Sequence, residues 1–155
     1  MKNNCHDALV FLSTMNLFQL TYLSKSELHP LGLHEELEII QKDASHFNRD
    51  KQISGILVYR DGYFLQRLEG NRKEVIYLAE RIAKDRRHSQ FRILTQSAIK
   101  ERLNTHFDHM LIVSSQRATR PLQPLLQKLI GSNTSTEALD TLLHTLHASH
   151  MQPAI

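Results

Sequence analysis

The sequence predicts an α+β protein: a ferredoxin-like βαββαββ sandwich with C-terminal helices packed on the opposite face of its sheet. Two observations support this prediction. Residues 53 to 70 form two apolar runs around Asp61-Gly62, a pair that favours the positive φ angles of a two-residue hairpin turn. Segments with helical spacing of apolar residues precede and follow this hairpin, and strand-like segments lie outside them, which gives the βαββαββ order.

Length and composition indicate one domain with a sizeable core. The 155 residues are 41% hydrophobic and 23% charged, without a repeat or a low-complexity run. The single cysteine, Cys5, excludes an internal disulfide framework and favours a reducing compartment. The apolar run at residues 8–12 is too short for a signal peptide, and no segment has the length of a membrane span, so we expect a cytoplasmic protein.

The chain divides into an N-terminal extension over residues 1–16, a central domain over 17–113 and a C-terminal helical extension over 114–155. The formal net charge of +3 mildly favours an anionic partner. Because the cations are spread over many positions, we expect no direct nucleic-acid binding.

Residues 17 to 24 alternate between two faces, as a strand does. One face carries Phe18, Leu20, Tyr22 and Ser24. The core-facing side therefore ends in two hydroxyl groups. A tyrosine that packs its ring in the core and extends its hydroxyl to the rim would explain part of this pattern.

The hairpin register places one amide on an apolar face. Counting outward from Asp61-Gly62 sets Leu57 opposite Gln66 and Val58 opposite Leu65. One face then carries Leu57, Tyr59, Phe64, Gln66 and Leu68. An unpaired buried amide costs about 1–3 kcal/mol. Gln66 therefore needs a polar partner, which could be the protein itself or a bound ligand.

Two amphipathic helices flank the hairpin. Apolar residues recur at spacings of three and four from Leu33 to Phe47, and Asn48 closes this first helix. The second helix starts after Asn71, a capping residue with Glu74 three positions later. Its apolar stripe consists of Val75, Leu78, Ala79 and Ile82. The basic cluster at its end can be explained by the helix dipole alone.

Residues 90–99 and 107–113 are predicted to complete an antiparallel sheet. The face turned away from the two helices carries Ile56, Val58 and Leu65, which would otherwise lie in water. Leucine stripes at 122–130, ending in Ile130, and at 139–146 have the helical spacing to cover this face.

Classical enzyme and metal-site motifs are missing from the sequence. No phosphate-binding glycine loop, nucleophile elbow or HExxH motif is present, so we predict no enzymatic activity. His144, His147 and His150 lie three apart, but no cysteine or paired acid completes a ligand set, and we predict no metal site. The remaining polar constellation consists of Tyr22, Ser24, Asn48 and Gln66. Convergent polar groups in an apolar hollow are typical of a ligand pocket.

These residues resemble those of the BLUF family, the flavin-based blue-light sensors, over about residues 17–113. The resemblance depends on Tyr22 with Ser24, Asn48 before Ile53-Ser54-Gly55, the phrase FLQRLEG, the stretch Asp85-Arg86-Arg87-His88, and Met110. It implies non-covalently bound FAD between the two helices. It further implies that Tyr22 is the light-driven electron and proton donor, that Gln66 is the relay amide, and that Met110 belongs to the photoactive group on the last strand.

The resemblance also implies a set of cofactor-binding residues. These are Ser24, Ile40, Asn48, Gln66, Arg81, Ile82, Asp85, Arg87 and His88. Ile40 and Ile82 would enclose the flavin ring, and Asn48 would hold its pyrimidine edge. Many family members carry a tryptophan two residues before the last-strand methionine, whereas this chain has Asp108 there.

The resemblance implies a short, single-domain sensor that signals to a protein partner, either a response regulator or a transcriptional regulator, and that forms a homo-oligomer. The two ends of the Gln66 amide differ as donor and acceptor, so its rotation or tautomerisation would rearrange the hydrogen bonds around it. The alternative is a light-blind ferredoxin-like interaction or RNA-binding module. The aromatic platform of RNA-binding sheets is absent from the sequence, and flavin colour separates the two hypotheses.

Overall fold

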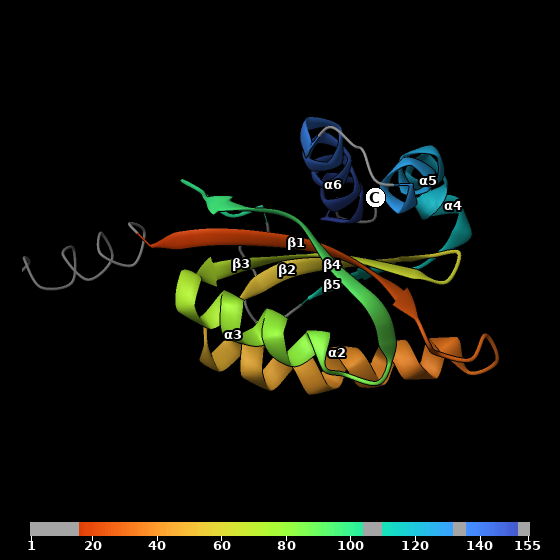
Figure 1. Cartoon of the computed structure of the whole chain (residues 1–155), viewed down its shortest axis with the longest axis horizontal. Coiled ribbons are helices and arrows are strands. Elements are labelled where there is room, and N and C mark those ends of the chain that lie inside the picture. The colour runs from red at the N-terminus through yellow and green to blue at the C-terminus, as the bar shows by residue number, and fades with distance from the viewer. Residues whose placement is uncertain (1–15, 104–109, 132–135, 152–155) are drawn as a thin grey trace, which may run out of the picture.

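The structure of the chain, a computed structural model, describes residues 16–103, 110–131 and 136–151. Its elements are β1 (Leu17–Ser26), α2 (Leu33–Asp50), β2 (Ser54–Arg60), β3 (Tyr63–Asn71), α3 (Arg72–Ala83), β4 (His88–Ala98), β5 (Leu111–Val113), α4 (Gln116–Thr119), the 3₁₀ turn η1 (Arg120–Leu122), α5 (Gln123–Ile130) and α6 (Thr136–Met151). One sheet separates two helical layers, with α2 and α3 on one face and α4, α5 and α6 on the other (Figure 1). The predicted fold class is confirmed. Most of the predicted N-terminal extension lies outside the described residues.

The sheet has the strand order β4-β1-β3-β2-β5. Strand β1 pairs antiparallel with β3 and β4, and β2 pairs antiparallel with β3. The prediction of a wholly antiparallel sheet is wrong at one edge, because β5 pairs parallel with β2. The chain leaves β4 at one edge and crosses to the opposite edge, where β5 runs in the same direction as its new neighbour. Strand β5 begins at Leu111, so Met110 lies immediately before it rather than within it.

The hairpin register is as predicted. Asp61 and Gly62 have φ angles of 50° and 81°, which is the left-handed region that the tight turn requires. Gln66 pairs with Leu57 on β2 and with Tyr22 on β1. Because directly paired residues share a face, the tyrosine and the amide lie side by side on the face that α2 and α3 cover.

Both flanking helices form where the sequence predicts them, with one shift at a boundary. Asn71 caps α3, since its side chain accepts a hydrogen bond from the Lys73 backbone N–H (3.0 Å). Helix α2 continues to Asp50, two residues past the predicted end. Asn48 therefore lies within the last turn of α2, where it is buried. Its side chain faces the interior instead of terminating the helix.

The outer face of the sheet is covered by the C-terminal helices, as predicted. Ile56, Val58 and Leu65 are almost completely buried there. They belong to one core cluster with Leu122, Leu126, Leu129, Leu139, Leu143 and Leu146. Ile130 departs from the predicted stripe, because it is the last residue of α5 and is 43% exposed.

Arg60 attaches the C-terminal helices to the end of the hairpin. Its buried guanidinium donates from Nη1 to the Gln116 carbonyl oxygen (2.8 Å) and to Thr119 Oγ1 (3.1 Å). Nη2 donates to Gln123 Oε1 (3.0 Å), and Nε forms an ion pair with Asp61 (3.2 Å). Because a buried guanidinium needs partners for its N–H groups, these contacts fix where α4 and α5 dock.

We expect Arg60→Ala to lower the free energy of unfolding by about 2–3 kcal/mol, since hydrogen bonds to a buried charged group are lost and their acceptors lose their partner. Urea denaturation measures the change. Arg49→Ala removes an exposed arginine of α2 and should change the stability by less than about 0.5 kcal/mol. Equal effects of the two substitutions would contradict the anchoring role of Arg60.

Candidate functional site

A pocket lies between the inner face of the sheet and helices α2 and α3. It contains roughly 530 Å³ of empty space, part of which is open to solvent. Its lining consists of Tyr22, Ile40, Ala44, Asn48, Leu57, Phe64, Gln66, Leu78, Ile82, Asp85, Arg87, His88 and Met110. The structure therefore brings together most of the residues predicted from the sequence.

Gln66 lies at the centre of a chain of buried side chains. The Tyr22 hydroxyl donates a hydrogen bond to Gln66 Oε1, and Gln66 Nε2 donates to the Met110 sulfur (2.6 Å). Gln41 Nε2 on α2 donates to the Met110 carbonyl oxygen (3.2 Å). The partner that the buried amide needs is therefore supplied by the protein, at both of its ends.

Burial controls the protonation state of Tyr22. The ring lies 4.5 Å from that of Phe91, centroid to centroid, and is almost completely buried. Burial raises the pKa of the Tyr22 hydroxyl well above its usual value; the negative charge of Asp85 raises it further, while Arg87 opposes this effect. Tyr22 is consequently a neutral phenol at physiological pH and can donate its proton.

An ion pair lies among the polar residues of the pocket. Arg87 Nη2 contacts Asp85 Oδ2 (2.7 Å), and Arg87 Nη1 contacts Asp43 Oδ2 on α2 (3.3 Å). The hydrogen bonds from the Arg87 side chain lower the pKa of Asp85, and the same bonds raise the pKa of Arg87. Both groups therefore stay charged, and they link α2 to the segment that follows α3.

His88 is held by two elements. One ring nitrogen, Nδ1, is 2.7 Å from Ser24 Oγ, and Nε2 contacts the carbonyl oxygen of Ile82 near the end of α3. The rings of Phe64 and Phe91 lie edge-on to the imidazole. Ser24 does not line the pocket, so its contact with the site runs through His88.

Arg81 also lies outside the pocket lining. Its guanidinium sits over the Phe47 ring at 5.2 Å and near the Tyr77 ring at 5.9 Å, and these two rings stack on each other. The apolar stripe of α3 could not predict the position of the Arg81 side chain. Arg81 is adjacent in sequence to the lining residue Ile82, but its side chain faces a different direction.

Four of the lining residues were not predicted as site residues. Ala44 and Leu78 lie on the predicted helical stripes, and Leu57 and Phe64 lie on the predicted hairpin face, so a signal for them existed. Gln41 had no such signal. It is a polar residue beside the stripe of α2, and its contact depends on where the chain returns before β5.

The histidines of α6 do not gather into a metal site. Within residues 16–103, 110–131 and 136–151, no three His, Cys, Asp or Glu side chains lie where they could hold a metal ion together.

The fold and the pocket define a small-molecule-binding α+β domain with a buried tyrosine–amide pair. A family model described as "Sensors of blue-light using FAD" matches residues 17–110. The chain belongs to this family, the BLUF family. The recognition from the sequence motifs is therefore confirmed, and the protein is a blue-light sensor that uses FAD.

Two curated relatives are long light-regulated enzymes. Photoactivated adenylate cyclase subunit alpha of Euglena gracilis is 34% identical over 123 residues, which is 78% of this chain but 12% of that protein. The beta subunit is 31% identical over 128 residues, which is 78% of this chain and 14% of that protein. This chain thus spans a small part of these relatives. The part that the family model matches is the blue-light sensor.

Two solved structures cover nearly the whole chain. "BlrB - a BLUF protein, dark state structure" has a TM-score of 0.72 at 29% identity and covers 86% of this chain and 97% of its own. "BlsA photo-activated state" has a TM-score of 0.73 at 25% identity and covers 90% and 98%. Among the described residues, no helix is long and apolar enough to cross a membrane.

The residues of the pocket fit a flavin. Asn48 Oδ1 is buried and has no hydrogen-bond partner among the described residues, although an unpaired buried acceptor costs about 1–3 kcal/mol. A flavin ring carries an N–H donor on its pyrimidine edge. Ile40 on α2 and Ile82 on α3 supply apolar walls for a planar ring. The pocket therefore offers both the acceptor and the enclosure that such a ring needs.

Proposed function

We propose that this chain reports blue light to a separate protein through the hydrogen bonds of Gln66. The observation that supports the proposal is the chain of contacts from the Tyr22 hydroxyl through the Gln66 amide to the Met110 sulfur. When bound, FAD supplies the absorption of blue light and a ring that can take up an electron.

Tyr22 holds a proton on its hydroxyl, aimed at Gln66 Oε1. If the bound ring takes an electron from Tyr22, the phenol becomes strongly acidic. Its proton would then move along the existing hydrogen bond to Gln66 Oε1 and return to the tyrosine oxygen when the electron returns. A rotated Gln66 presents its NH₂ group to the Tyr22 oxygen and its carbonyl oxygen to the Met110 sulfur. A thioether sulfur cannot donate, so the contact that holds the Met110 side chain is lost. The rearrangement thus releases the Met110 side chain from Gln66, while Gln41 still donates to the Met110 carbonyl oxygen.

The flavin-holding roles follow the same geometry. Asn48 would accept a hydrogen bond from the N–H of the ring, and Ile40 and Ile82 would enclose the ring. Asp85, Arg87 and His88 line the polar part of the pocket. There they would meet the edge of the ring or the ribityl and phosphate groups. Ser24 contributes to the site by orienting His88. Arg81 contributes from outside the pocket lining, where its guanidinium lies over the Phe47 ring and near the Tyr77 ring.

The output is a contact with another protein. The curated relatives are named as photoactivated cyclases, and the family's light response there acts on an enzyme. For this chain we propose a response regulator or transcriptional regulator in the cytoplasm as the partner. The C-terminal helices form the signalling surface, and we propose that the chain works as a homo-oligomer.

We expect the purified protein to be yellow, to release FAD on denaturation, and to show a reversible red shift of its flavin band under blue light. Absorption spectra in the dark and during illumination test this directly. A protein that stays colourless after incubation with FAD would contradict the proposal and favour a light-blind module with the same fold.

A further inference from the structure

Beyond the flavin pocket, the hairpin strand β3 carries a second set of polar residues. Gln66 and Leu68 face the pocket side, so Arg67 and Glu69, which alternate with them, face the C-terminal helices. Both side chains are buried, and the Glu69 side chain is fully enclosed. The β1 residues directly opposite them, Gln19 and Thr21, are also buried and polar, whereas the neighbouring part of the outer face is a leucine-rich core.

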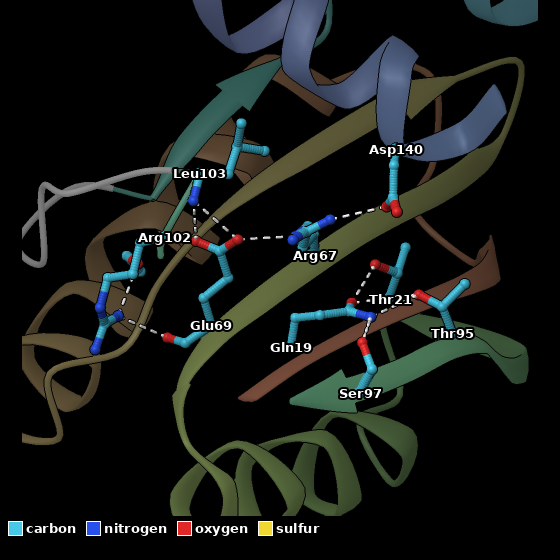
Figure 2. A network of polar contacts seen from close by, with 10 residues as sticks. Gln19, Thr21, Arg67, Glu69, Thr95, Ser97, Arg102, Leu103 and Asp140 are labelled. Carbon is cyan, nitrogen blue, oxygen red and sulfur yellow. Dashed lines mark hydrogen bonds and ion pairs between the residues drawn. The ribbon is translucent and has the colours of Figure 1, made fainter. Parts of the chain in front are cut away.

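Arg67 links the sheet to α6. Its Nε donates to Glu69 Oε1 (2.8 Å), and its Nη1 donates to Asp140 Oδ1 on α6 (2.8 Å). Figure 2 shows Arg67 between the two carboxylates. Asp140 follows the fully packed Leu139 on α6, but its own side chain is 47% exposed. The Arg67 guanidinium, which is adjacent in sequence to Gln66, thus contacts α6 on the outer face of the sheet.

Glu69 links the same strand to the chain that returns toward Met110. Its carboxylate accepts two contacts from the Leu103 backbone N–H (3.1 and 2.9 Å), and its carbonyl oxygen accepts from Arg102 Nη1 (2.9 Å). These contacts are visible in Figure 2. Leu103 and Met110 are the two described ends of the connection between β4 and β5, and both are bound to β3: one by Glu69, the other by Gln66.

We infer that Arg67 and Glu69 couple the hydrogen-bond state of Gln66 to the docking of α6, with Asp140 as the contact on the helix. This inference builds on the proposed function. Gln66 and Arg67 are adjacent on β3, so a change in the hydrogen bonds of Gln66 acts on the strand that carries Arg67. Arg67 in turn joins Glu69 to Asp140 on α6. Arg67 and Glu69 are positioning residues, since neither lines the flavin pocket.

The test is hydrogen exchange of the flavin-loaded 155-residue chain in the dark and under blue light. A coupling free energy of ordinary size predicts that the backbone amides of α6 exchange about fivefold faster in the light than in the dark. In Asp140→Ala the red shift should remain while this light-to-dark ratio falls to about one. A purely structural role for Asp140 would speed exchange equally in light and dark and leave the ratio unchanged.

Glu137→Ala provides the matched control, because it removes an exposed carboxylate from the first turn of the same helix. Glu137→Ala should have the same light-to-dark exchange ratio as the unaltered protein. Asp140→Glu, which keeps the carboxylate, should keep most of the ratio that Asp140→Ala loses. A normal red shift together with an undiminished ratio in Asp140→Ala overturns the coupling inference alone. An unaltered protein without a red shift overturns the proposed function, and the inference with it.

Discussion

Gln66→Leu is expected to abolish the light-induced red shift while the protein still binds flavin. Leucine keeps much of the volume of glutamine, so the pocket remains closed around its apolar walls. It has neither an acceptor for the Tyr22 hydroxyl nor a donor for the Met110 sulfur, and both contacts are lost together. Difference absorption spectra of the illuminated and dark protein measure the effect.

Gln41→Leu is the appropriate control for this substitution. It deletes an amide that also contacts Met110, but at the backbone carbonyl oxygen and from α2. We expect Gln41→Leu to keep the full red shift and to alter only the rate of return in the dark. A full red shift in Gln66→Leu, or its loss in both variants, would show that the relay does not run through the Gln66 amide.

The sequence predicted the pairing at the centre of the site because that pairing depends on local rules. The Asp61-Gly62 turn fixes the hairpin register, and the register fixes which side chains share a face with Gln66. Alternation along residues 17 to 24 then places Tyr22 on the same face. The leucine stripes at the C-terminus likewise predicted the cover of the outer face, since an apolar sheet face needs a partner.

The features that escaped prediction depend on contacts between distant segments. The parallel pairing of β5 depends on which edge the chain reaches after β4, and no local pattern encodes that choice. Ser24 shares the predicted face, yet it contacts His88 instead of the pocket. The network of Arg67 with Asp140 joins residues 73 positions apart, so the sequence showed only two ordinary charges. Asp108 lies outside the described residues.

Gly55→Ala is expected to disrupt the hairpin on which the site is built. A Cβ at position 55 would lie 2.1 Å from the Arg67 carbonyl oxygen, a backbone atom of the neighbouring strand that no side-chain rotation can move. The strands β2 and β3 would have to separate beside Gln66 and Arg67. We expect a loss of about 3 kcal/mol of stability, at the upper end of the usual cost of overpacking, which corresponds to a fall in Tm of roughly 10 °C.

Gly131→Ala tests whether this loss comes from the close approach and not from glycine replacement in general. Gly131 follows α5 with φ near −81°, and a Cβ there would meet its nearest neighbour, the Gln127 carbonyl oxygen, at an ordinary 3.5 Å. Since alanine restricts the unfolded chain, this variant should be as stable as the unaltered protein or up to about 1 kcal/mol more stable. Thermal unfolding of the flavin-loaded proteins compares the two. The expectation is contradicted if Gly55→Ala has the same Tm as Gly131→Ala and keeps its red shift. In that case β2 and β3 tolerate separation, and their close approach does not determine the contact between Gln66 and Tyr22.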